Sequence, residues 1–198
     1  MAKKRFDQVY QFKITLKGIK PPIWRRIQIP ETHTFWSLHV AIQDAMGWLD
    51  YHLHAFEMLD STTKMKVTIG IPEGPFDTEF LPSVKLRMAD YFSMENRLAK
   101  YEYDFGDGWI HEIRLEKILP KKEGIDYPIC IAGKRACPPE DCGGIWGYED
   151  LLKAISDETH EEHARMMEWL GDEFDPEYFD PDSVSIDDPD VRRKLAFG

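Results

Sequence analysis

The residues best suited to catalysis lie in the stretch 103–111, YDFGDGWIH, and in the short segment 52–54, HLH, earlier in the chain. Imidazoles and carboxylates in one site could perform general acid–base work or hold a metal ion for hydrolysis. The candidates for this catalysis are His52, His54, Asp104, Asp107 and His111. The alternative is structural: Asp107 would bond turn amides, and His111 would be a core histidine satisfied by a tyrosine hydroxyl or a carbonyl.

A second set of residues suggests zinc. Cys137 and Cys142 have four residues between them, and His52-x-His54 would place two imidazoles on one strand face. Thiolates and imidazoles suit Zn²⁺. However, the spacing is not that of a standard zinc finger, and reduced cysteines are often buried as small apolar residues. We therefore expect no cofactor and no disulfide between Cys137 and Cys142, with zinc as the alternative.

Alternating residues on both sides of Gly106-Asp107-Gly108 predict a β-hairpin. A three-residue loop would pair Phe105 with Trp109 and Tyr103 with His111, which keeps one face aromatic and apolar. Trp109, His111, Ile113 and Leu115 would then share a buried face with Tyr103 and Phe105. Asp104 and Asp107 would lie at the solvent side or the rim.

Aromatic and basic side chains provide candidates for a binding surface. Tyr103 and Trp109 could stack on the bases of a nucleic acid, although an aromatic strand face more often belongs to the core. Trp24, Arg25 and Arg26 lie together on another expected strand, where the two arginines suit an edge-strand pair as well as a ligand.

The order of the expected elements favours an α+β fold, a mainly antiparallel sheet built from hairpins with packed helices. Period-two alternation predicts strands near 9–16, 24–29, 52–58, 64–71 and 127–131, and helical periodicity predicts helices at 35–46, 148–155 and 160–170. From Asp172 onward, acids and prolines interrupt the pattern. We expect an α+β domain over residues 1–156 and an acidic helical C-terminal extension over 157–198, packed on the domain or trailing from it.

Composition and charge limit the function classes. No apolar run approaches the roughly 18 residues of a membrane helix, the N-terminus lacks the apolar core of a signal peptide, and three cysteines form an odd set, so we expect a cytoplasmic protein without a membrane partner. Residues 1–30 carry a net charge of +7 and residues 140–190 a net charge of −16, within a total of −11. This balance opposes docking on a phosphate backbone, so direct sequence-specific DNA binding is not expected.

Several motifs resemble those of the Ri-plasmid ORF-three-like family. They are PIWRR at 22–26, the Leu38-His39 helix that ends at Gly47-Trp48, HLHAF at 52–56, YDFGDGWIHEI at 103–113 and ACPPEDCGG at 136–144 leading into Gly147-Tyr148. The last two are long and unusual enough to be specific. The resemblance covers roughly residues 8–156 and implies an α+β domain, but it implies little about activity.

Some relatives carry the label TnpR, which refers to a passenger protein of insertion elements. A serine resolvase needs a nucleophilic serine just after its first strand and a helix-turn-helix for DNA. The first serine here is Ser37, inside an expected helix, so the label lacks support. The leading hypothesis is a non-catalytic binding or interaction module linked to mobile elements, with a protein as its partner. The alternatives are a metal-assisted hydrolase or nuclease and an acidic mimic of nucleic acid.

Overall fold

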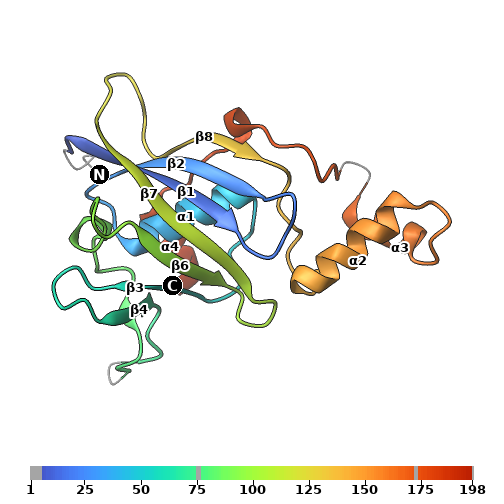
Figure 1. Ribbon diagram of the computed structural model, residues 1–198, viewed down its shortest axis with the longest axis horizontal. Helices are drawn as coiled ribbons and strands as arrows, with labels where there is room; N and C mark the ends of the chain where they lie inside the picture. Colours follow the sequence, from blue (N-terminus) through green and yellow to red (C-terminus); the bar gives the residue numbers. More distant parts are fainter. Residues whose placement is uncertain (1–5, 75–76, 172–173, 198) are drawn as a thin grey trace.

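The computed structural model describes residues 6–74, 77–171 and 174–197 and confirms the α+β fold class (Figure 1). Eight strands form one sheet in the order β5-β4-β3-β6-β7-β1-β2-β8, and all neighbours are antiparallel except β4 and β5. The strands are β1 (Gln8–Leu16), β2 (Trp24–Pro30), β3 (His54–Leu59), β4 (Lys66–Gly70), β5 (Leu81–Pro82), β6 (Leu98–Tyr103), β7 (Trp109–Pro120) and β8 (Ile129–Lys134).

Four α-helices occur in the described residues: α1 (Phe35–Met46), α2 (Gly144–Ser156), α3 (His163–Leu170) and α4 (Pro189–Phe197). Short 3₁₀ helices lie at Met88–Asp90 and Pro181–Ser183. Helix α1 lies against one face of the sheet, while α2 and α3 extend from one end of the molecule (Figure 1). No helix within the described ranges is both long and apolar enough to cross a lipid bilayer.

The core joins the inward face of the sheet to α1. Along β1 the apolar residues Tyr10, Phe12, Ile14 and Leu16 are buried, as their alternation predicts. Helix α1 begins where expected, because the side chain of Thr34 accepts a hydrogen bond from the Ser37 amide. It ends at Gly47, which adopts a left-handed conformation with φ of 88°.

The predicted register of the β6–β7 hairpin is wrong, because the partner of each β7 residue lies two residues earlier in the chain than predicted. Tyr103 pairs with Trp109 and Tyr101 with His111, so that five residues rather than three connect the strands. Tyr103, Trp109, His111, Ile113 and Leu115 are buried as predicted, but Phe105 belongs to the turn and is 47% exposed. Asp104 is buried instead of lying at the rim, because it takes a left-handed conformation with φ of 53° and folds back under the turn.

The acidic C-terminal segment folds back onto the domain and is more regular than the interrupted pattern suggests. Pro189 begins α4, since a first helical residue needs no amide donor. The carbonyl oxygen of Pro189 accepts a hydrogen bond from Trp36 Nε1 at 2.8 Å, and Arg192 forms an ion pair with Asp44 at 2.6 Å. Helix α1 is therefore covered by the sheet on one side and contacted by α4 on another.

The corrected register predicts that two aromatic residues of the hairpin contribute very differently to the free energy of unfolding. Trp109→Ala should lower the free energy of unfolding by about 3–5 kcal/mol, because it leaves a cavity in the core. Phe105→Ala should change it by less than about 0.5 kcal/mol, since Phe105 lies at an exposed turn. Urea denaturation measures both values, and equal losses in the two variants would contradict this register.

Candidate functional site

Three segments meet beside the hairpin turn: the loop 47–53 after α1, the turn 104–108 and the segment 137–144 before α2. Tyr103, at the end of β6, holds two of them. Its hydroxyl donates a short hydrogen bond to Glu140 Oε1 and accepts one from the Tyr51 amide at 3.0 Å. Glu140 Oε2 in turn accepts from the Leu49 amide at 2.8 Å. The loop and the segment are thus fixed to one strand end.

The turn itself is organised by Asp104. Its Oδ1 accepts hydrogen bonds from the amides of Gly106 at 2.9 Å and Asp107 at 3.3 Å, while its carbonyl oxygen accepts from the Gly108 amide at 2.7 Å. Asp107 then contacts the neighbouring segment, because its Oδ2 accepts from the Gly143 amide at 3.2 Å. These bonds leave the second carboxylate oxygen of Asp104 directed away from the turn.

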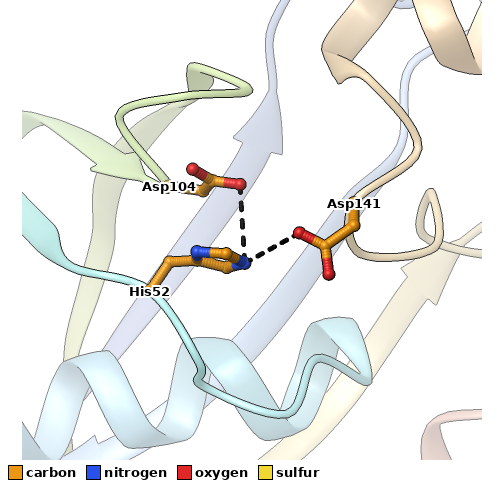
Figure 2. Close-up of side chains that lie close together, drawn as sticks. All are labelled: His52, Asp104 and Asp141. Carbon is orange, nitrogen blue, oxygen red and sulfur yellow. Dashed lines mark hydrogen bonds and ion pairs between the residues drawn. The ribbon is translucent and has the colours of Figure 1, made fainter.

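His52, Asp104 and Asp141 converge where the three segments meet (Figure 2). His52 Nε2 lies 3.1 Å from Asp141 Oδ1 and 3.7 Å from Asp104 Oδ2. Among the described residues, this is the one group of at least three His, Cys, Asp or Glu side chains whose ligand atoms lie close enough to hold a metal ion, all within 4.8 Å. We call these three residues the His52 cluster. They could bind a cation or form a histidine–carboxylate hydrogen-bond network.

An open groove of about 600 Å³ lies next to the His52 cluster and shares Asp141 with it. We call it the Trp48 groove. Its walls come from the loop after α1, the segment 137–141, the end of α3 and Phe174, and its main lining side chains are Trp48, Leu49, Tyr51, Pro139, Glu140 and Trp169. The Trp48 ring is fixed in place by a hydrogen bond from its Nε1 to the Pro138 carbonyl oxygen at 2.9 Å and by stacking on Tyr103 at 5.0 Å.

Comparison with known proteins assigns the family. The family model described as plasmid pRiA4b ORF-3-like protein matches residues 8–183. The chain belongs to this family. The match extends beyond residue 156, so it includes more than half of the acidic C-terminal segment.

Two relatives share most of the ORF-3-like chain. The uncharacterized protein y4hQ of Sinorhizobium fredii (strain NBRC 101917 / NGR234) is 38% identical over an alignment of 171 residues. The match covers 82% of this chain and 81% of y4hQ. The crystal structure of MM3350, a protein of unknown function from Methanosarcina mazei Go1, has a TM-score of 0.87 and 55% identity, and the match covers 91% of this chain and 99% of that one. These relatives support the family and the fold without assigning an activity.

Two other candidate histidines of the ORF-3-like chain lie in the core. His54 starts β3 and stacks on His39 with ring centroids 3.7 Å apart, and neither of its ring nitrogens has a hydrogen-bond partner in the described structure. His111 Nδ1 lies 3.1 Å from the Trp109 carbonyl oxygen and therefore donates to it, as the structural interpretation expects of a core histidine. Burial lowers the pKa of both imidazoles, in the case of His111 to about 3. His52 and His54 therefore do not form a pair on one strand face.

The cysteines lie apart from the His52 cluster. Burial raises the pKa of the Cys137 thiol, and burial together with the Asp107 carboxylate raises that of Cys142 to about 12. Both are free thiols, and among the described residues neither belongs to a group of three His, Cys, Asp or Glu side chains that lies close enough to hold a metal ion. This geometry favours the packing interpretation of Cys137 and Cys142 over zinc.

The binding candidates on the strands are largely buried or paired. Tyr103 and Trp109 belong to the core, and so does Arg25, whose guanidinium lies 3.6 Å from the ring centroid of Phe179 and donates to the Ala45 carbonyl oxygen at 2.7 Å. Arg26 forms a two-point ion pair with Glu116 at 2.6 and 2.9 Å and lies over the half-buried Trp24 ring. The exposed chemistry of the ORF-3-like chain therefore lies at the loops rather than on the sheet.

Sequence reasoning missed Asp141 and the groove residues Leu49 and Tyr51. The signal for Asp141 was the motif at 136–144, which we interpreted through its cysteines rather than its acids. The signal for the loop was an inverted alternation: Leu49, Tyr51 and Leu53 are 63%, 73% and 51% exposed, whereas the polar residues between them point inward.

Burial of neutral His111 predicts a specific loss of stability in acid. The unfolded chain binds a proton near the ordinary pKa of about 6.5, whereas the native imidazole does so only near 3. The free energy of unfolding should therefore fall as the pH drops from 6.5 towards 3, by up to about 1.4 kcal/mol per pH unit for this group. The free energy of unfolding of His111→Leu, measured by urea denaturation, should fall correspondingly less between pH 7 and pH 5. An identical loss in both proteins would contradict the neutral, buried state of His111.

Proposed function

We propose that the chain is a non-catalytic binding module whose Trp48 groove takes a segment of a partner protein. One observation carries this proposal: the loop 49–53 turns three large apolar side chains to solvent. Leu49, Tyr51 and Leu53 are each more than half exposed along five residues, and Trp169 adds a half-exposed indole on the facing wall of the groove. Exposed apolar side chains around a hollow are typical of protein-interaction sites.

Charge supports a basic partner segment. The groove ends at Glu140 and Asp141, and residues 140–190 carry a net charge of −16. The Asp141 carboxylate is exposed, so it can attract a lysine or arginine of the partner. We therefore propose an extended segment that combines an aromatic or aliphatic anchor with a basic residue. The family's connection with a plasmid open reading frame supports a partner encoded by, or acting on, mobile elements.

Metal-assisted hydrolysis is the second candidate, because His52, Asp104 and Asp141 converge. Such a reaction also needs a base within reach of the attacking water. Glu140, the neighbouring carboxylate, has both oxygens occupied by the Tyr103 hydroxyl and the Leu49 amide, and the other two candidate histidines are buried. These contacts favour binding over catalysis.

Selection from a displayed peptide library tests the groove. Peptides enriched on the full chain should contain a basic residue beside an aromatic or aliphatic one, because the groove is apolar with an acidic end. The double variant Leu49→Ser/Tyr51→Ser should weaken their binding by at least about tenfold, measured by fluorescence polarisation, since buried aromatic anchors contribute most of such energies.

Met65→Ser is the matched control, because Met65 is also exposed but does not line the Trp48 groove. Binders that respond equally to both variants, or a selection that enriches none, would overturn the proposed function.

Duplex DNA should bind weakly and without sequence preference. Arg25 is buried, Arg26, Arg135 and Arg192 are each paired with carboxylates of the chain, and the net charge of −11 opposes docking on a phosphate backbone. Titration of labelled duplexes at about 0.15 M salt, where screening extends about 8 Å, measures this. A specific dissociation constant below about 10⁻⁸ M would contradict it and would revive a recombination-linked role.

A further inference from the structure

The His52 cluster has the dimensions of a metal coordination sphere. In tetrahedral coordination with bonds of about 2.0–2.1 Å, as Zn²⁺ makes to nitrogen and oxygen, two ligand atoms are separated by about 3.3 Å. The distances from His52 Nε2 to Asp141 Oδ1 and Asp104 Oδ2 are 3.1 and 3.7 Å. Both distances are within a few tenths of an ångström of this value, and the three ligand atoms all lie within 4.8 Å of one another.

Asp104 presents an oxygen that the turn leaves open. The residue is 8% exposed, and the turn amides occupy only its Oδ1. No described residue donates a hydrogen bond to Oδ2, and His52 Nε2 at 3.7 Å lies beyond hydrogen-bond distance. Oδ2 is not fully buried, so a water molecule or a cation can reach it. Oδ2 points towards the centre of the cluster (Figure 2).

His52 contributes a ring nitrogen from the other side. Its Nε2 faces two carboxylate oxygens (Figure 2). Either a hydrogen on Nε2, which the neutral tautomer can carry, or a metal ion between the three groups suits this arrangement. A metal satisfies both carboxylates at once, whereas one proton on Nε2 reaches Asp141 at 3.1 Å but not Asp104 at 3.7 Å.

We propose that His52, Asp104 and Asp141 bind a divalent transition-metal cation. One imidazole and two carboxylates suit Zn²⁺, which accepts both nitrogen and oxygen ligands, better than the softer Cu⁺ or the all-oxygen preference of Ca²⁺. Three protein ligands and the exposed position of Asp141 leave a coordination position for water or for a partner's side chain. The site does not depend on the proposed occupant of the Trp48 groove.

Isothermal titration of the full, chelator-treated chain with Zn²⁺, repeated with Mn²⁺, tests the site. Wild type should bind one equivalent. Asp104→Asn and Asp141→Asn should each weaken binding by more than about 100-fold, because even loss of a partner behind a ligand costs about 10–100-fold. Both positions have a left-handed backbone, with φ of 53° and 58°, which asparagine tolerates. In the Asp104→Asn variant the side-chain carbonyl oxygen can still accept the turn amides that Oδ1 accepts in wild type.

Asp150→Asn is the charge-matched control, because it removes the same charge from an exposed residue of α2 that lies outside the cluster. It should bind the metal like wild type. His52→Gln adds a variant at a partly exposed position, and thermal melting of each variant checks folding. In wild type and in the control, but not in Asp104→Asn or Asp141→Asn, Zn²⁺ should also shift the imidazole resonances of His52 and raise the melting temperature.

Three results would overturn the site. The first is that wild type binds neither metal stoichiometrically, and the second is that Asp104→Asn and Asp150→Asn bind with equal affinity. The third is binding that is lost in Cys137→Ser/Cys142→Ser but retained in Asp104→Asn. Leu49→Ser/Tyr51→Ser should bind Zn²⁺ like wild type. Failure of the proposed metal site can therefore be distinguished from failure of the proposed function of the Trp48 groove.

Discussion

The hydroxyl of Tyr103 is the contact on which the site depends. It lies at the end of β6, donates to Glu140 and accepts from the Tyr51 amide, so a single group fixes two separate segments to the sheet. Burial and the Glu140 carboxylate raise the pKa of this phenol, which keeps the hydroxyl protonated and able to donate. Because Glu140 also holds the Leu49 amide, the loop is fixed at two points, Leu49 and Tyr51. This contact, together with the Asp107–Gly143 and Trp48–Pro138 hydrogen bonds, positions His52 and Asp141 relative to Asp104.

A second polar network joins α1 to the C-terminal segment. His39 lies between the Tyr101 hydroxyl at 2.8 Å and Asp50 at 2.7 Å, and Asp50 lies 3.5 Å from Arg192 in α4. Buried polar groups of this kind stabilise a fold only when the partners are all present. The acidic C-terminal segment therefore completes the core network through its few basic residues, which explains why it folds back although its net charge is strongly negative.

The sequence predicted those elements whose periodicity follows from one buried face. Strands β1 and β2 and helix α1 occur within a residue or two of the expected bounds, because alternation and capping are local properties. The hairpin register was not predictable in this way. We placed Phe105 inside by its apolar character, whereas the turn begins two residues earlier than predicted, at Asp104, which has a left-handed backbone. Helix α4 was missed because acids and prolines interrupt the pattern before it and none of its residues is buried, so that its position depends on distant contacts with Trp36 and Asp44.

The His52 cluster was predictable only in part for a related reason. His52 and Asp104 are marked by residue type, but Asp141 comes from a distant segment that reaches them through Glu140 and Gly143. His54 and His111 are also histidines that could take part in catalysis, but they lie on strands and are buried in the core. Residue type indicates which side chains can do chemistry, whereas the long-range contacts of Tyr103 and Asp107 decide which of them meet.

The inverted loop 49–53 connects the groove to the cluster. Asp50 and His52 contact groups on the inner side of the loop, whereas Leu49, Tyr51 and Leu53 are exposed, and the left-handed backbone of Asp50, with φ of 63°, bends the loop between them. This geometry explains why the three positions are exposed but not why they are apolar, since polar residues would fit solvent there without disturbing the inward side chains. Three large apolar residues at such positions lower solubility and add no core packing. A surface that contacts another molecule accounts for them, and its position against the His52 cluster places the proposed partner beside the open coordination position of the proposed metal.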